Sequence, residues 1–214
     1  MAEMTDGERI AEKRIAKAAR TGQDWLDLGS LGLTRLPDAL SKLTKLKRLS
    51  IGERFEMKAE GMVARKRTGK KNSLSDISAV ASLSDLRRLY LDQTNCNDLS
   101  PIAGLQQLQS LSCWGTPVSD LSHIAGLQQL HHLDCDGTKV SDLSPIAGLK
   151  QLRNLYCGDT KVRDLSHIAG LQQLHTLACN GTKVSALSPI AGLQQLQHLD
   201  CRRTQVSDLS PIAG

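Results

Sequence analysis

The chain has 214 residues, of which aromatic residues make up only 2%, so a hydrophobic core must be built from Leu, Ile, Val and Ala. The formal net charge of +5 is modest, and no apolar run approaches the roughly 20 residues that a membrane span requires. The N-terminus is charged and lacks the hydrophobic region of a signal peptide, so we expect a cytoplasmic protein.

The first segment predicts an amphipathic helix. Thr5 and Glu8 have the spacing of a capping box, in which each side chain accepts a hydrogen bond from the other residue's backbone. Small and apolar residues then recur at helical spacing up to Thr21, and Gly22 is a typical stop. We expect residues 1–22 to form a capping helix that covers one end of the remaining chain.

A repeated leucine frame fills the rest of the chain. Its leucines at five corresponding positions are 22 residues apart, namely Leu105, Leu127, Leu149, Leu171 and Leu193. A period of 20 to 30 residues with leucines in this frame is typical of a leucine-rich-repeat solenoid. The predicted fold class is therefore α/β, a curved right-handed coil over residues 23–214, with about eight parallel strands on the concave face. Short helical turns or loops are expected on the convex face.

The frame is interrupted once. The first coil runs from Leu26 to the equivalent Leu49, a period of 23 residues. The frame resumes at Leu74, so an insertion lies within residues 52–73, directly after the second strand. The insertion has seven Lys or Arg residues against three Glu residues. We expect a solvated loop. The alternative is a site for nucleic acid or another polyanion, formed by Arg65, Lys66, Arg67, Lys70 and Lys71.

Several repeat positions carry the same polar residue in successive coils. Five of the six cysteines occupy one strand position, where Ile51 and Leu91 stand in earlier coils, so we predict buried, unpaired thiols and no metal site. Threonines three residues later are expected to hydrogen-bond to backbone groups of the turn. The Ser of each Ser-Pro pair is expected to cap the convex turn, and His123 and His167, which replace Pro, to be surface residues.

Variable positions point to function, because the repeats can be compared with one another. Side chains alternate between the two faces of a strand, so the residues flanking each inward Leu and Cys face the concave surface. These positions contain every Trp and Tyr, which we expect to be exposed and to bind a partner together with charged neighbours. The predicted partner-binding residues are Trp25, Asp27, Arg48, Arg88, Tyr90, Asp92, Trp114, His132, Asp134, Asp136, Tyr156, His198, Asp200 and Arg202.

An enzymatic function is not predicted. His132, Asp134 and Asp136 share one face of one strand, but neighbouring strands add Ser, Asn and Tyr at the same positions, so neither a metal sphere nor a catalytic triad is complete. The sequence has no glycine-rich motif that would bind phosphates. We expect no cofactor, no metal and no catalytic residue.

The frame Leu-x-x-Leu-x-x-Leu-x-Cys-x-x-Thr-x-Val-x-Asp-Leu-Ser-Pro-Ile-Ala resembles the 22-residue bacterial leucine-rich repeats of internalin type over about residues 74–214. The opening Arg-Ile-Ala-Lys-Ala-Ala-Arg-Thr-Gly, followed by Leu-Asp-Leu-Gly, looks like the start of cytosolic bacterial repeat proteins, including Roco-type GTPases. This resemblance implies a repeat array that precedes an effector domain. No GTPase motif is present.

Together these features predict a non-catalytic protein-protein recognition module, the sensor or scaffold part of a larger bacterial multidomain protein. Its expected ligand is a protein or peptide bound through the concave face, without membrane contact. The sequence stops halfway through a coil at Gly214, with no capping sequence, so we expect a truncated C-terminal end. Such an end would also allow end-to-end contact, and the oligomeric state is not predicted.

Overall fold

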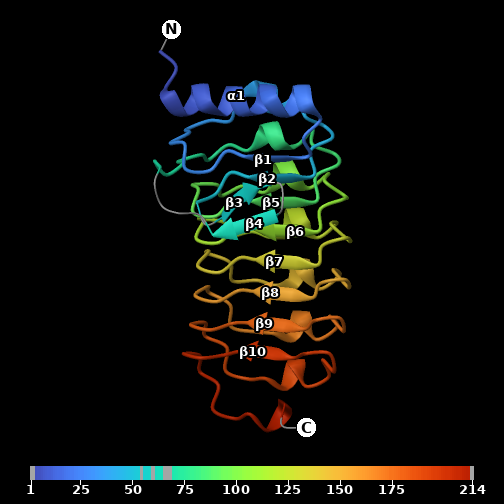
Figure 1. Cartoon of the computed structure of the whole chain (residues 1–214). Coiled ribbons are helices and arrows are strands. Elements are labelled where there is room, and N and C mark those ends of the chain that lie inside the picture. The colour runs from blue at the N-terminus through green and yellow to red at the C-terminus, as the bar shows by residue number, and fades with distance from the viewer. Residues whose placement is uncertain (1–2, 54, 59–60, 65–68, 213–214) are drawn as a thin grey trace.

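Helix α1 (Asp6–Thr21) lies across one end of an elongated stack of coils (Figure 1). The structure, a computed structural model, describes residues 3–53, 55–58, 61–64 and 69–212. Thr5 Oγ1 accepts a hydrogen bond from the Glu8 amide at 3.2 Å, and Glu8 Oε2 accepts one from the Thr5 amide at 2.8 Å. Gly22 ends the helix in the left-handed conformation. The capping box and the stop predicted from the sequence are therefore confirmed.

Eight short parallel strands form one sheet in the order β1-β2-β5-β6-β7-β8-β9-β10. Each strand has three residues, and each pairs with its neighbour in register, Leu opposite Leu. The predicted leucine-rich-repeat solenoid is thus confirmed. The strands are β1 (Trp25–Asp27), β2 (Arg48–Ser50), β5 (Arg88–Tyr90), β6 (Ser110–Ser112), β7 (His132–Asp134), β8 (Asn154–Tyr156), β9 (Thr176–Ala178) and β10 (His198–Asp200).

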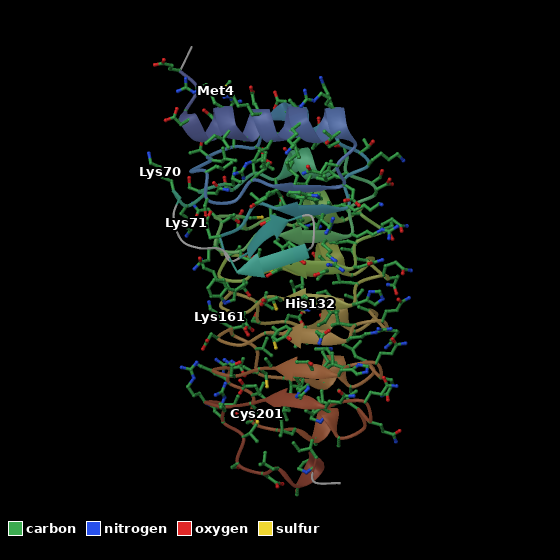
Figure 2. The ribbon with its side chains drawn as sticks, viewed as in Figure 1. Met4, Lys70, Lys71, His132, Lys161 and Cys201 are labelled. Atoms are coloured by element: carbon green, nitrogen blue, oxygen red, sulfur yellow. The ribbon has the colours of Figure 1, made fainter. Side chains whose placement is uncertain are left out.

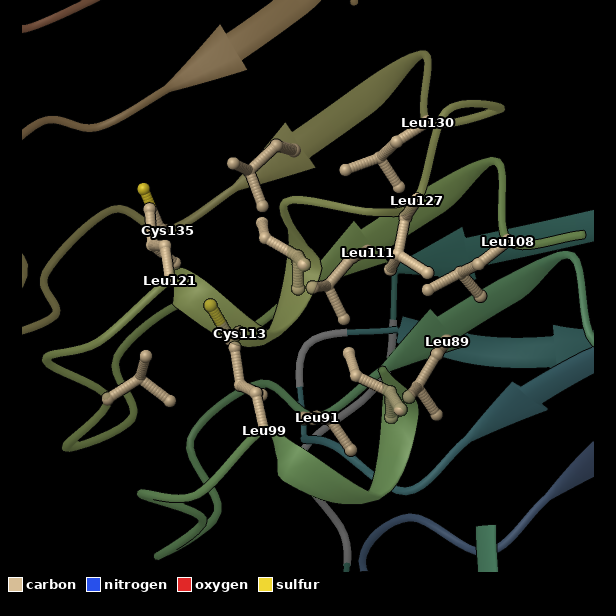
Figure 3. Close-up of a cluster of buried hydrophobic side chains, with 14 of the residues drawn as sticks. Leu89, Leu91, Leu99, Leu108, Leu111, Cys113, Leu121, Leu127, Leu130 and Cys135 are labelled. Atoms are coloured by element: carbon tan, nitrogen blue, oxygen red, sulfur yellow. The ribbon is translucent and has the colours of Figure 1, made fainter. Parts of the chain in front are cut away.

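The core lies between the sheet and a row of 3-10 turns on the opposite side of each coil. Leucines from strands and turns meet there without solvent contact, as Figure 3 shows for Leu89, Leu111 and Leu127. Cys113 and Cys135 occupy corresponding positions of successive coils in the same cluster. The 3-10 turns are Asp38–Lys42, Ser78–Val80, Ser100–Ile102, Ser122–Ile124, Ser144–Ile146, Ser166–Ile168, Ser188–Ile190 and Ser210–Ile212.

The cysteines act as small hydrophobic residues in this core. All six are free thiols, and only Cys201, in the last coil, is not fully buried. Burial raises the pKa of the Cys96 thiol to about 11 and that of the Cys179 thiol to about 12. Because the thiolate is the reactive form, these side chains are chemically inert at neutral pH.

A ladder of threonine hydroxyls closes the turn after each strand. In six coils the threonine Oγ1 donates a hydrogen bond to the carbonyl oxygen three residues earlier, for example from Thr116 to Cys113 at 2.6 Å. These bonds satisfy buried carbonyl groups at the point where the chain leaves the sheet. The predicted role of the threonines is confirmed.

The prediction that a serine caps each 3-10 turn is wrong. The serine is not the cap but the first residue of the turn, and the carboxylate two residues earlier accepts its hydrogen bonds. Asp98, for example, accepts one bond from the Ser100 amide and one from the Ser100 hydroxyl, both at 2.7 Å. A short aspartate side chain reaches a backbone amide two residues ahead in such a turn. The same pair of bonds recurs at Asp120, Asp142, Asp164 and Asp208.

The insertion, expected to be a solvated loop, contains two strands that the sequence did not predict. Its backbone forms an antiparallel hairpin of β3 (Phe55–Lys58) and β4 (Gly61–Ala64). Since β2 pairs directly with β5, the insertion leaves the main sheet intact. Strand β3 lies beside β1 and β2, and in Figure 1 the hairpin crosses the front of the sheet. Residues 54, 59–60 and 65–68 lie outside the described part of the chain.

Glu53 and Asn72 anchor the two ends of this insertion on the first coil. Glu53 accepts hydrogen bonds from the Ser30 and Asn72 amides at 3.1 and 2.9 Å. The fully buried Asn72 side chain bonds to four backbone groups of two coils. Its Oδ1 accepts from the Leu31 and Leu33 amides, and its Nδ2 donates to the carbonyl oxygens of Leu28 and Ile51.

Replacing Asn72 by Ala tests this clamp. The variant leaves four backbone groups without their side-chain partner, so we expect the free energy of unfolding, measured by urea denaturation, to fall by about 3 kcal/mol. Asn95→Ala is the matched control, because the exposed Asn95 side chain makes one 3.3 Å bond to the Ser73 carbonyl oxygen. Equal stability of the two variants would contradict the role of Asn72.

Ala186→Asp tests the capping carboxylates, because Ala186 stands where Asp164 stands one coil earlier. The new carboxylate can accept the Ser188 bonds, so we expect the Tm at pH 7 to rise by about 2 to 4 °C. Hydrogen bonds from Ser166 lower the pKa of Asp164. With a folded pKa below the unfolded value of about 3.9, the gain is present above that value and is lost as the pH falls through the folded pKa.

Ala186→Asn is the control for this pH dependence, since its amide oxygen also accepts hydrogen bonds but does not titrate. Thermal unfolding of the three proteins between pH 7 and pH 2 measures the difference. A stabilisation by Asp that is absent at pH 7, or that persists unchanged at pH 2, would show that the carboxylate does not cap the turn.

Candidate functional site

The sheet register brings the predicted partner-binding residues together in three columns on one face. This face, opposite the 3-10 turns, is called the concave face below. The columns contain the first residue of each strand, the third residue, and the residue two positions further on. They hold Trp25, Arg48, Arg88, His132 and His198; Asp27, Tyr90, Asp134, Tyr156 and Asp200; and Asp92, Trp114, Asp136 and Arg202.

Four of these residues are buried rather than accessible. Tyr90 is only 4% exposed and Asp92 is fully buried, while Asp27 and Asp134 are 6% and 5% exposed. The hairpin, which was not predicted, lies beside β1 and β2, in front of the sheet in Figure 1. Burial also raises the pKa of the Tyr90 hydroxyl.

The remaining predicted residues are accessible to different degrees. Arg88, His198 and Arg202 are exposed, and the other residues are half-buried. The half-buried residues are Trp25, Arg48, Trp114, His132, Asp136, Tyr156 and Asp200. The accessible part of the concave face therefore lies mainly on the later strands.

Carboxylates on this face serve the backbone and neighbouring side chains. Asp134 Oδ1 accepts a hydrogen bond from the Asp136 amide at 3.2 Å, and Asp136 Oδ1 accepts one from the Gly158 amide. The Ser112 hydroxyl donates to Asp92 Oδ1. The two backbone bonds hold the turns that follow β7 and β8, which is a structural role that the spacing of the residues did not reveal.

The structure does not assemble a catalytic or metal site from His132, Asp134 and Asp136. The His132 ring packs against the Tyr156 ring with 5.3 Å between centroids, and the two aspartates make the backbone bonds described above. Over the described residues, no group of three or more His, Cys, Asp or Glu side chains could hold a metal ion. In the same part of the chain, no helix is both long and apolar enough to span a bilayer.

Only part of the candidate polyanion site can be placed. Lys70 and Lys71 are exposed and lie on the flank where the strands end (Figure 2). Their backbone is anchored, since the Lys70 carbonyl oxygen accepts a hydrogen bond from the Gly32 amide at 2.8 Å. Arg65, Lys66 and Arg67 lie outside the described residues.

Two exposed arginines beside the starts of the strands were not predicted. Arg87 and Arg153 stand directly before β5 and β8. Their carbonyl oxygens accept hydrogen bonds from backbone amides of the next coil. The predicted positions began at the first strand residue, one residue too late to include them. Their signal in the sequence is that this repeat position changes from coil to coil, as the concave positions do.

Comparisons with known proteins agree with this architecture. Residues 128–170 match the model for "Leucine Rich repeats (2 copies)". Among curated proteins, none matches the chain. The structure of internalin C2 from Listeria monocytogenes is similar, with a TM-score of 0.81, 26% sequence identity, and coverage of 96% of this chain and 87% of that chain.

Two further solved structures share the fold at lower identity. A leucine-rich-repeat protein from Leptospira interrogans has a TM-score of 0.62 and 23% identity, with coverage of 91% of this chain and 59% of that one. The functional domain of InlJ from Listeria monocytogenes, described as including a cysteine ladder, has a TM-score of 0.60 and 20% identity, with coverage of 90% and 47%. The chain therefore contains leucine-rich repeats and has the fold of an internalin-like solenoid.

Proposed function

We propose that this chain is a non-catalytic protein-recognition module that binds a protein or peptide through its concave face. One observation carries the proposal. The inward Leu, Cys and Thr positions repeat almost unchanged from coil to coil, while the outward positions of the same strands vary between coils. The repeated positions are the ones that stabilise the stacked coils. Variation that is restricted to one accessible face is therefore typical of a surface that recognises a partner.

The chemistry of the accessible part of this face suits a protein partner. The later strands carry Tyr156 and His132 in ring contact, with Arg202 and His198 exposed nearby in the last strand region. Aromatic residues and Arg are enriched in protein interfaces, where they provide large contact areas at low entropic cost. The stacked sheet holds these side chains on a rigid support, which reduces the cost of ordering them on binding.

Two further aspects of the proposal concern chemistry and setting. His132 packs against the Tyr156 ring, and Asp134 and Asp136 accept backbone hydrogen bonds, which supports recognition rather than catalysis. Six free thiols suit a reducing compartment, so we place the protein in the cytoplasm. We further propose that the array is the sensor or scaffold part of a larger bacterial multidomain protein, as its resemblance to such proteins implies.

A photo-crosslinking pair tests the proposed face. Benzoylphenylalanine is introduced at Thr176, on the concave face of β9, or at Gln173, an exposed residue of the same coil before the strand. We expect crosslinks to discrete proteins of a bacterial lysate from position 176 and not from position 173. Mass spectrometry of the adducts identifies the partner class.

The contrary results are equally specific. Equal crosslinking from positions 176 and 173 would show that the concave face is not the binding surface. Crosslinks to nucleic acid instead of protein, abolished by replacing the five basic insertion residues with Gln, would favour the polyanion alternative.

A further inference from the structure

Charge is sorted along the strands of the concave face. The residue before each strand and the first strand residue form the start rim; the third strand residue and the residue two positions later form the end row. The end row contains one cation, Arg202, and five carboxylates. The carboxylates are Asp27, Asp92, Asp134, Asp136 and Asp200. The start rim instead contains five cations and one carboxylate, Asp24; the cations are Lys47, Arg48, Arg87, Arg88 and Arg153.

Some of these charges form ion pairs between described residues. Asp24 lies 3.4 Å from Lys47 Nζ and 3.1 Å from Arg48 Nη2, so it compensates the cations of β2. Arg202 in the end row pairs with Asp200 at 2.6 Å. The remaining three cations of the start rim, Arg87, Arg88 and Arg153, are all exposed, and none forms an ion pair with a described residue.

We propose that the start rim between β5 and β8, through Arg87, Arg88 and Arg153, docks an acidic peptide segment of the protein partner. The proposal rests on the proposed recognition function and adds the chemistry of the ligand. Exposed guanidinium groups form paired hydrogen bonds with carboxylates, which a lysine ammonium cannot do, so three arginines are well suited to Asp and Glu side chains.

The end row favours a peptide over a nucleic acid. Its carboxylates lie two to five residues further along the chain than the start rim, which corresponds to roughly 7 to 16 Å. The Debye length at physiological salt is about 8 Å, so a ligand at the start rim is largely screened from most of the end row. A nucleic acid is negative along its whole backbone and, lying across the face, would also place phosphates beside the end row, where five carboxylates outnumber one cation. A peptide, in contrast, can place its acidic side chains at the start rim without bringing negative charge to the end row.

The spacing of the arginines sets the spacing of the acidic residues. Arg87 and Arg88 are adjacent at β5, and Arg153 precedes β8, three strand intervals away. Strands are about 4.8 Å apart, so this separation is roughly 14 Å, which an extended peptide spans in about four residues. A ligand with two acidic clusters about four residues apart fits the rim.

Three Arg-to-Gln substitutions in one variant, Arg87→Gln, Arg88→Gln and Arg153→Gln, test the proposal. The probe is a short fluorescein-labelled peptide of alternating Glu-Glu and Gly-Ser pairs, followed by fluorescence anisotropy. We expect salt-sensitive binding to the unmodified protein and an affinity loss of about tenfold or more in the variant.

The chain supplies a matched control in Lys139, Lys161 and Lys183. These lysines are exposed in successive coils and follow the strands, on the opposite flank from the start rim, as Figure 2 shows for Lys161. Replacing all three by Gln removes the same net charge, and we expect less than about a threefold change in affinity. Circular dichroism checks that both variants are folded.

Three results would overturn the proposal. They are a lack of binding of the acidic peptide to the unmodified protein, an equal loss in both triple variants, and equally tight binding of single-stranded DNA with the same dependence on the arginines. Protein crosslinks from position 176 that persist unchanged in the arginine variant would leave the recognition function standing and reject the acidic ligand. Loss of those crosslinks in the arginine variant alone supports docking at the rim.

Discussion

Parallel in-register stacking of one leucine per strand is the constraint on which this structure depends. Each coil has a three-residue strand, too short to be stable alone, so its hydrogen bonds and its buried Leu are useful only when a neighbour lies on either side. The 22-residue period keeps every coil in the same phase. Consequently the thiol, the hydroxyl and the capping carboxylate of one coil lie above their equivalents in the next.

This regularity separates residues that hold the fold from residues that are free to vary. Thr116 closes a turn and Asp120 caps the next one, and both roles recur down the stack. Polar residues that first suggest chemistry are thereby explained as backbone partners. What remains for function are the side chains that no neighbouring coil requires, and these lie along the outward side of the sheet and at its start rim.

The insertion divides that outward side into unequal parts. Glu53 and Asn72 hold its ends against the first coil, and the β3–β4 hairpin lies beside β1 and β2. In the next coil, Tyr90 and Asp92 are buried, whereas Arg88, on the same strand as Tyr90, is exposed at the start rim. A partner thus meets a surface whose cations are accessible and whose first carboxylates are covered.

The sequence by itself determined the solenoid, the strand positions, the free thiols and the threonine ladder, because each follows from a local pattern that repeats at a fixed period. It also determined which residues share a face, since alternation along a strand needs no tertiary information. Only the tertiary structure decided how exposed those residues are and that Asn72 links two coils through contacts with residues 21 to 44 positions away. Such contacts cannot be recognised from the repeat pattern, because Asn72 occurs once, at the end of the insertion. The position of the insertion on the first coil is set by single side chains such as Asn72 and Glu53 rather than by a repeated residue.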